Sequence, residues 1–415
     1  MGLVACLLLG DVGRSENHEW KRTKPDSAIY LPNDAGRSDR CNQQVVGVVT
    51  KKGTYLAVWT MASTEASKDQ RVVASRSTDQ GVTWSVPGVI DGDSKTNPGS
   101  ASYGVPFVIP ATGRIYIFYL KNNGQSKVRS DITGFLKWQY SDDDGQTWHS
   151  VKARFNMGCG EWTEADADAP GHFIGIYAPH ITNQGDVLFS FARYGLAPGM
   201  KGYESWMTEV YFLRMDNVLT EADPAKLKFT VLPDSPQGLR LKRTGVGDKE
   251  LYWSNEPSWI ELSDRRLLTA FRTRNGTIHY SVSKDRGVNW SSPEAFLARD
   301  GKPLRNPSAP CPLVRLNDGR IVLMFYNQSP SSTFGPRNPV YLVVGREALD
   351  ARQPIEWGEP VKFMEVSEVP KEGTTYVQVA SYSSIIEHDG KLFLFYNDCK
   401  HWVLFKEIPA DFLKY

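Results

Sequence analysis

Three side chains next to short apolar segments have the types needed to act on an acidic molecule. Glu256 opens one such segment, Arg272 closes the following one, and Tyr382 opens another near the C-terminus. The planar guanidinium of arginine binds a carboxylate through two parallel hydrogen bonds. A tyrosine hydroxyl, with an ordinary pKa of about 10, stays neutral until a base takes its proton. Residues of these types suit chemistry on a negatively charged substrate.

The composition indicates a β-rich protein without the charge bias of nucleic-acid or membrane-surface proteins. The 48 Lys and Arg residues nearly balance the 47 Asp and Glu residues, so any charge that attracts a substrate must be local. The 12 Trp, 18 Tyr and 18 Phe residues and the widely spread 35 Gly and 25 Pro residues are typical of short strands and many turns. No apolar run reaches the roughly 18 residues of a membrane span. We therefore expect a glycan or oligosaccharide partner, no nucleic acid and no membrane span.

Neither the cysteines nor the N-terminal residues indicate a metal, redox or catalytic site. The five cysteines are scattered and form no C-x-x-C pair, and no metal-ligand spacing is seen, so neither a metal nor a cofactor is expected. The first ten residues are apolar but lack the basic start of a signal peptide. Residues 1–19 are therefore interpreted as a tail or a degraded export signal, and the protein as secreted, periplasmic or cell-surface.

A repeated turn motif organises the chain. Residues 77–84, 141–148 and 283–290 share the pattern S-x-D-x-G-x-[TN]-W, and a worn fourth copy ends at Trp357. Successive tryptophans are 64, 142 and 67 residues apart, so one unit in the middle lacks the motif and should have a substitute turn near residues 215–217. In each copy the Asp can bond backbone amides and the Gly can adopt a positive φ. We expect Trp84, Trp148 and Trp290 to be buried beneath their own turns.

Between these turns, two apolar segments separated by a short turn occur six times. The pairs are 44–49 with 55–60, 105–109 with 115–119, 176–182 with 187–192, 258–262 with 267–272, 312–316 with 321–326, and 382–387 with 392–396. The repeat predicts one all-β domain over residues 20–415, a six-bladed β-propeller, with room for a seventh blade in the long middle stretch. A segment near residues 28–31 is expected to close the ring by joining the last blade.

The turn motif resembles the Asp box of the sialidase (neuraminidase) superfamily, and the resemblance covers roughly residues 28–398. Sialidases have three arginines for the substrate carboxylate, a tyrosine nucleophile paired with a glutamate, and an aspartate acid/base. Residues 255–262 resemble the segment with the glutamate, and residues 381–384 resemble the segment with the tyrosine. The resemblance implies Tyr382 as nucleophile, Glu256 as its base, Asp69 as acid/base, and Arg40, Arg272 and Arg337 as the carboxylate clamp.

This resemblance implies an exo-acting glycosidase that removes a terminal sialic acid from glycans. The carboxylate on the anomeric carbon of that sugar would repel a carboxylate nucleophile, whereas a neutral tyrosine avoids the repulsion; tyrosine-dependent sialidases are a known exception to the two-carboxylate scheme. We expect the Tyr382 hydroxyl within hydrogen-bond reach of Glu256, with Arg272 and Arg337 in the same pocket, on the face opposite the Asp boxes.

Two features near Arg40 depart from the family pattern. Sialidases usually read Arg-Ile-Pro there, whereas this chain reads Arg-Cys-Asn-Gln-Gln over residues 40–44. The terminal glutamate that steadies the first arginine is missing, since Tyr-Asn-Asp stands at residues 396–398. The carboxylate clamp therefore differs from that of the family, which leaves a terminal sugar other than sialic acid as an alternative.

Two other functions fit parts of the sequence. Some propellers of similar appearance remove rhamnose from glucuronic acid at glycan ends, by hydrolysis or by β-elimination. Elimination needs a base such as His or Tyr, and Tyr177 and His180 open the third unit near the expected axis. Gln43 and Gln44 also suit a uronate site better than a sialidase carboxylate clamp. The last alternative is a non-catalytic glycan-binding propeller.

Overall fold

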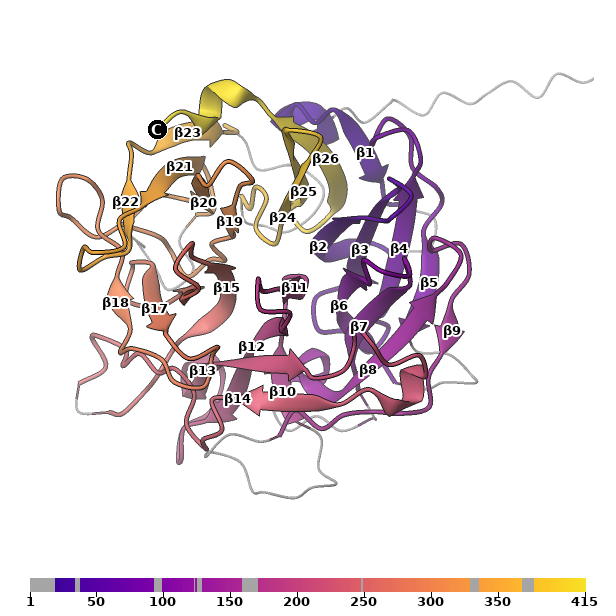
Figure 1. Cartoon of the computed structure of the whole chain (residues 1–415), viewed down its shortest axis with the longest axis horizontal. Coiled ribbons are helices and arrows are strands. Elements are labelled where there is room, and N and C mark those ends of the chain that lie inside the picture. Colours follow the sequence, from indigo (N-terminus) through magenta and orange to yellow (C-terminus); the bar gives the residue numbers. More distant parts are fainter. Residues whose placement is uncertain are drawn as a thin grey trace, which may run out of the picture.

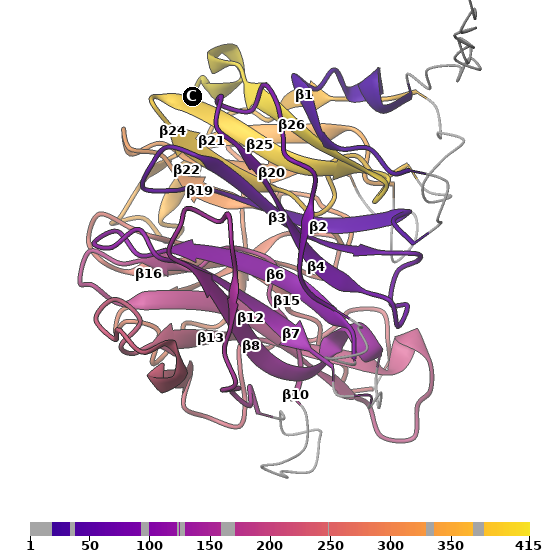
Figure 2. The ribbon, with the colours of Figure 1, turned by 90° about the vertical axis from the view of Figure 1, so that its right-hand side faces the viewer.

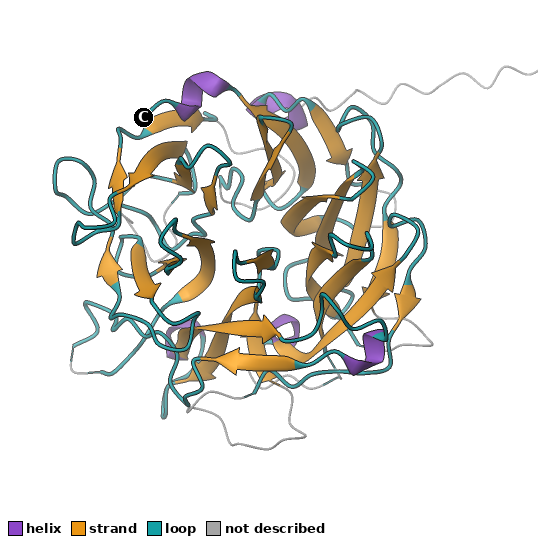
Figure 3. Ribbon diagram, in the orientation of Figure 1, coloured by secondary structure: helices purple, strands orange, loops and turns teal. Residues whose placement is uncertain are grey.

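Short apolar segments bounded by Gly, Asp and Asn turns form antiparallel strands in the computed structural model of the chain. The strands lie in sheets around a central axis, which is a propeller arrangement (Figure 1). Loops connect the strands, and the helices are single short turns (Figure 3). The structure describes residues 19–33, 38–92, 99–122, 124, 129–158, 171–247, 249–328, 336–367 and 377–415. The predicted all-β class is confirmed.

The described strands form five hydrogen-bonded sheets. The first contains β2 (Cys41–Val49), β3 (Tyr55–Ala62), β4 (Arg71–Ser77) and β5 (Gly88–Gly92). The second contains β6 (Ala101–Val108), β7 (Ile115–Lys121), β8 (Thr133–Ser141), β9 (His149–Ser150), β10 (Gly171–Ile174), β11 (His180–Ile181), β12 (Val187–Leu196), β13 (Trp206–Met215) and β14 (Phe229–Leu232).

The remaining sheets follow in chain order. The third contains β15 (Asn255–Glu261), β16 (Leu267–Arg272), β17 (His279–Ser283) and β18 (Glu294–Ala295). The fourth contains β19 (Leu313–Arg315), β20 (Ile321–Phe325), β21 (Val340–Glu347), β22 (Ile355–Trp357) and β23 (Val361–Met364). The fifth contains β24 (Ser384–His388), β25 (Lys391–Asp398), β26 (Trp402–Ile408) and β1 (Ser27–Tyr30). The 3-10 helices are η1 (Glu19–Thr23), η2 (Ser130–Ile132), η3 (Tyr203–Ser205), η4 (Pro224–Lys226) and η5 (Ala410–Leu413).

The predicted strand pairs form the inner part of the ring. Five of them are the hairpins β2–β3, β6–β7, β15–β16, β19–β20 and β24–β25. The third is shorter than predicted, because only His180 and Ile181 pair with β12 and the preceding Pro179 has no N–H to donate. The strands of the second and third units share one sheet through two residue pairs between β8 and β10. The number of six blades therefore stays a prediction.

The two ends of the described chain close the ring. Strand β1 pairs with β26 in antiparallel register, and the two lie side by side in both ribbon views (Figures 1 and 2). The segment predicted to join the last blade does so. In the preceding helix η1, the Arg22 guanidinium donates to the fully buried Asp398 carboxylate at 2.6 and 2.7 Å. Because the first and last strands share one sheet, opening the ring requires breaking that sheet.

The Asp-box turns have the predicted hydrogen bonds. In the first copy the Asp79 carboxylate accepts from the Thr83 amide at 2.9 Å and from the Ser77 hydroxyl at 2.7 Å. Gly81 has a φ of 89°, and a Cβ there would lie 2.4 Å from Phe405, so glycine is required for both shape and space. In the unit without the motif, Asp216 accepts from Thr230 and donates its amide to the Lys228 carbonyl, which is the predicted substitute turn.

The tryptophans of these turns are only half-buried, so the prediction that they lie fully beneath their turns was wrong. Trp84 and Trp290 donate their indole N–H to the glycine carbonyl of their own turn, at 3.1 and 3.0 Å. The Trp290 ring stacks on Phe212 with 4.4 Å between centroids, and the residue stays partly exposed. Part of each Asp-box indole is therefore open to solvent.

Candidate active site

Residues predicted to act on the substrate lie at the end of the ring opposite the Asp boxes. The inner strand of each sheet begins at the end of the ring where these residues lie. At the opposite end, the turn between β2 and β3 contacts an Asp box, because the Thr50 and Thr54 hydroxyls donate to the Asp144 carboxylate at 2.5 and 2.6 Å. Three inner strands start with a bulge at which a non-glycine residue has a positive φ: Gln44 (59°), Tyr103 (55°) and Glu256 (49°). Such bulges redirect a side chain and are common beside functional sites.

Glu256 and Arg272 form a buried ion pair beside Tyr382. Nη1 of Arg272 lies 2.5 Å from Oε2 of Glu256 and 3.3 Å from the Tyr382 hydroxyl. No direct hydrogen bond between Glu256 and Tyr382 is seen in the described structure, so the predicted contact passes through Arg272. The Nε atom of Arg272 is buried and has no hydrogen-bond partner among the described residues. Burial lowers the pKa of Arg272, but the charge of the neighbouring Glu256 carboxylate raises it, and the net pKa lies well above its ordinary value.

Two further cations flank the Tyr382 ring. The guanidinium carbon of Arg337 lies 5.2 Å from the ring centroid, and Nζ of Lys400 lies 5.0 Å from it. Arg337 is held by the Ser308 carbonyl at 3.1 Å and has 4% of its surface exposed. Arg272 and Arg337 thus both lie at Tyr382, as predicted. Their hydrogen-bond partners, Glu256 and Ser308, come from different parts of the chain. The concentration of positive charge around one tyrosine ring suits an anionic substrate.

A second charged cluster continues from Lys400, and the sequence did not single it out. Glu65 Oε2 lies 2.6 Å from Lys400 Nζ, and its Oε1 lies 3.6 Å from Arg129. Arg129 also pairs with Asp131 at 2.5 Å, and Asp131 accepts from the Tyr103 hydroxyl at 2.9 Å. Burial raises the pKa of Glu65, but Lys400 and Arg129 lower it to a net value of about 2. Glu65 keeps 39% of its side chain exposed, so solvent screens part of this attraction.

For two other predicted site residues, Asp69 and Arg40, the described contacts are with groups other than Tyr382. The Asp69 carboxylate accepts hydrogen bonds from the Ser63 amide at 3.1 Å and from the Ser63 and Ser67 hydroxyls. It therefore orders the β3–β4 loop in which Glu65 also lies. Arg40 is exposed, and its carbonyl contacts the His401 ring at 2.9 Å. The roles of Asp69 and Arg40 stay predictions, because order along the chain does not determine where a loop directs its side chains.

An aromatic cluster lies around the charged groups. It contains Tyr103, Ile132, Ile174, Ile176, Tyr177, Ala192, Tyr194 and Trp253, with Tyr203, Trp206 and Tyr382 packed partly exposed against it. The rings of Tyr203 and Trp206 meet at 4.8 Å, edge to face. The Asn255 side chain donates to the Tyr194 hydroxyl at 2.7 Å and so joins this cluster to the strand that bears Glu256. Partly exposed aromatic faces beside charged groups suit a sugar, which is apolar on its ring faces and polar at its edge.

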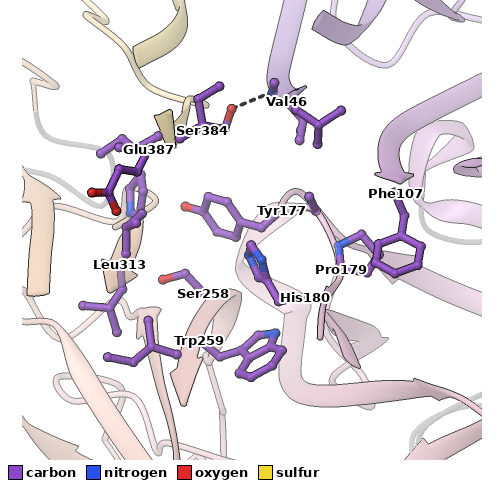
Figure 4. Close-up of a pocket in the computed structure, with 18 of the residues that line it drawn as sticks. Val46, Phe107, Tyr177, Pro179, His180, Ser258, Trp259, Leu313, Ser384 and Glu387 are labelled. Atoms are coloured by element: carbon purple, nitrogen blue, oxygen red, sulfur yellow. Dashed lines mark hydrogen bonds between the residues drawn. The ribbon is translucent and has the colours of Figure 1, made fainter. Parts of the chain in front are cut away.

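The two residues of the alternative site, Tyr177 and His180, line a cavity of about 550 Å³ along the axis (Figure 4). The cavity is lined by the later parts of the inner strands, including Val48, Val108, Glu261 and Glu387, and therefore lies toward the Asp-box end. His180 lines it and meets Trp259 edge to face at 5.8 Å. Tyr177 reaches the aromatic cluster under Tyr382, and its hydroxyl has no hydrogen-bond partner in the described structure. His180 and the Tyr382 group thus belong to different ends of the axis.

No group of three His, Cys, Asp or Glu side chains that could hold a metal is found among the described residues. No described helix is long and apolar enough to cross a membrane. The described cysteines Cys41, Cys311 and Cys399 are buried and form no disulfide with one another.

Residues 53–394 match the family model described as BNR repeat-like domain. No curated protein matches the chain. Among solved structures, the Hadza microbial sialidase Hz136 superposes with a TM-score of 0.61 at 16% identity, over 91% of this chain and 67% of that one. The NanB sialidase from Streptococcus pneumoniae superposes with a TM-score of 0.62 at 14% identity, over 94% and 71% of the two chains.

The likeness extends beyond sialidases. The alpha-L-arabinanase of Penicillium chrysogenum has a TM-score of 0.56 at 11% identity, over 93% of this chain and 98% of that one. At such identities the likeness shows the fold alone: these neighbours are glycosidases with different substrates. The fold is therefore that of sialidase-like glycoside hydrolases, and the choice of substrate depends on the site residues.

Proposed function

This chain belongs to the BNR repeat-like family, and we propose that it is an exo-acting glycoside hydrolase that removes a terminal acidic sugar, with sialic acid as the first candidate. One observation supports this most. Tyr382 lies against three cations, Arg272, Arg337 and Lys400, and one of them is paired with Glu256. This arrangement combines a hydroxyl nucleophile, a potential base and positive charge for a carboxylate in one place.

Arg272 links substrate binding to activation of the tyrosine. Its guanidinium contacts both Glu256 and the Tyr382 hydroxyl, and its Nε–H is unused in the described structure. A substrate carboxylate that engages Arg272 weakens its hold on Glu256. The Glu256 carboxylate is then able to accept the Tyr382 proton as the phenol oxygen attacks the anomeric carbon. The glycosidic C–O bond breaks in the same step.

The leaving oxygen needs a proton, and we assign this role to Asp69. Glu65, in the same loop, is held ionised by Lys400 and Arg129, which makes it a poor proton donor. The described partners of Asp69 are serine groups and none is a cation. In the second step Asp69 takes a proton from water, water attacks the anomeric carbon, and the tyrosyl bond breaks as Glu256 returns the proton to Tyr382.

We infer six blades for the same protein. The nine-stranded sheet has two parts, one built on the inner hairpin β6–β7 and the other on the inner hairpin β11–β12. Two residue pairs between β8 and β10 join these parts. Counting these parts as two blades gives the arrangement expected from six paired segments.

The uronate-specific alternative has less support. The cavity that contains His180 is lined by one arginine, Arg315, whose guanidinium contacts Glu347 at 2.9 Å. A base acting on a uronate needs a free neutralising group for the carboxylate. The presence of Glu256, Arg272 and Tyr382 in one cluster likewise argues against a non-catalytic binding protein.

Turnover of a sialyl reporter substrate by the full chain tests the proposal. Tyr382→Phe should remove most turnover and leave substrate binding within a few-fold of wild type, because only the nucleophilic oxygen is lost. Tyr280→Phe is the control, since Tyr280 stacks on Phe296 at 4.5 Å in the outer part of the third sheet. Full activity of Tyr382→Phe would exclude the tyrosine mechanism. An absorbance rise at about 235 nm on a rhamnosyl-glucuronate, the signature of an unsaturated uronate, would favour elimination instead.

A further inference from the structure

Lys400 is placed in the site by a strained turn. It lies in the tight turn between β25 and β26, where Cys399 and Lys400 have positive φ values of 53° and 52°. The Lys400 carbonyl accepts from the Asn42 amide at 2.6 Å, which ties this turn to the start of β2. Non-glycine residues in this region of φ cost free energy, and such positions cluster where a side chain must be aimed. The turn directs a lysine toward Tyr382 from the last sheet.

The Lys400 ammonium is buried with a partner that is itself partly open to solvent. The Lys400 side chain is 5% exposed, and its Nζ lies 2.6 Å from Glu65 Oε2, whereas the Glu65 side chain is 39% exposed. A buried ammonium is costly to desolvate, and one screened carboxylate offsets this only in part. Stability alone gives no reason to keep this charge 5.0 Å from the Tyr382 ring.

Lys400 also lies where the carboxylate clamp lacks its first arginine. Arg40, which the sequence suggested as the first arginine, is exposed. Arg337, shortly before β21, flanks the same Tyr382 ring as Lys400, which lies in the turn between β25 and β26. Beside Tyr382, the described site thus has Lys400, paired with Glu65, as its third cation.

We propose that Lys400 is the third cation that binds the carboxylate of the substrate, and that Glu65 is the positioning residue that holds it. This assignment rests on the proposed function and deepens it. An ammonium is a compact point charge without the planar fork of a guanidinium. Lys400 therefore selects for negative charge on the substrate more than for one orientation of a carboxylate, and Arg272 and Arg337 supply the orientation.

The test compares two probes that differ only in charge, N-acetylneuraminic acid and its methyl ester, by calorimetric titration of the full chain. Wild type should bind the acid more tightly than the ester. Lys400→Met should weaken binding of the acid roughly 30-fold, the low end expected when a partner of a buried charge pair is truncated, and leave the ester nearly unchanged. Lys400→Arg should restore most of the preference, because it restores the charge.

Two further variants separate a binding role from a structural one. Glu65→Gln keeps the lysine but loosens it, so the preference for the acid should fall by a smaller factor than in Lys400→Met. Lys391→Met is the matched control, because Lys391 forms a similar ion pair with Glu407 at 2.8 Å on the same sheet but lies exposed. It should keep the wild-type preference.

The outcomes are distinct. If Lys400→Met keeps the wild-type preference for acid over ester while wild type still cleaves the sialyl reporter, the role of Lys400 is refuted and the proposed function stands. If Lys400→Met weakens binding of both probes equally, Lys400 is a structural residue and the inference is also refuted. If wild type binds neither probe and cleaves no sialyl substrate, the proposed function itself fails.

Discussion

The Arg272 guanidinium holds the Glu256 carboxylate at 2.5 Å, and only 5% and 2% of the two side chains are exposed. Removing both charges from water costs several kcal/mol, and their attraction in the interior roughly repays it. The pair as a whole therefore contributes little net stability. Loss of one partner has a different effect, because it leaves the other charge buried without compensation.

Glu256→Gln should therefore lower the free energy of unfolding by about 3 kcal/mol, the low end for breaking a buried ion pair. The double variant Glu256→Gln/Arg272→Met should be less destabilised than the single one, since no unpaired charge remains. Urea denaturation followed by tryptophan fluorescence measures both. A single variant within about 0.5 kcal/mol of wild type would show that the pair is not buried as described.

Arg337→Lys should raise the KM for an acidic substrate roughly tenfold, with a smaller change in kcat, because an ammonium cannot reproduce bidentate binding of a carboxylate. Steady-state kinetics on the sialyl reporter gives both values. Arg346→Lys is the control: Arg346 lies near the end of β21, the strand that follows Arg337, and is exposed, with its guanidinium 4.4 Å from the Tyr415 ring. Equal effects of the two substitutions would argue against a role for Arg337 in binding.

The repeat made the architecture predictable, because each Asp box needs a fixed set of residues at fixed spacing. Ser, Asp and Gly bond the same backbone groups in each copy, as Asp79, Asp143 and Asp285 show. The substitute turn at Asp216 followed from the doubled spacing alone. The burial of the tryptophans was not predictable in this way, because it depends on which neighbouring loop covers the outer face of each ring.

The site was predictable where a strand fixes the side chain and not where a loop does. Arg272 pairs with Asn255 across β16 and β15, which puts the next residue, Glu256, close to it, and the bulge at Glu256 brings its carboxylate to the guanidinium. The β3–β4 loop contains both Glu65 and Asp69, and spacing does not tell which one faces the site. Lys400 had one signal in the sequence: it follows a predicted strand at the end of the ring where the other site residues lie.

Trp290→Ala should lower the free energy of unfolding by about 2 kcal/mol. The value lies below the roughly 3–5 kcal/mol typical of fully buried aromatics, because this residue is partly exposed although its ring stacks on Phe212 at 4.4 Å. Val288→Ala, in the same turn and 41% exposed, should cost less than about 0.5 kcal/mol. Chemical denaturation of both variants tests whether the Asp-box tryptophans hold the strand ends together.

His180 should make stability depend on pH although it takes no part in the proposed catalysis. The walls of the axial cavity lower its pKa toward about 4 by removing part of its hydration, against an ordinary value of about 6.5, although the residue stays exposed to the solvent in the cavity. Between these values the unfolded chain binds a proton that the folded chain does not. The contribution of His180 is therefore fully present above about pH 6.5 and is lost as the pH falls toward about 4.

When the pH is lowered from 7.5 to 4.5, the Tm of His180→Gln should therefore decrease less than the Tm of wild type. At pH 7.5 the variant should turn over the sialyl reporter at the wild-type rate. Calorimetric scans at several pH values measure the difference. A large loss of turnover in His180→Gln would instead indicate that the axial cavity takes part in the chemistry, and would weaken the assignment of Tyr382 as the nucleophile.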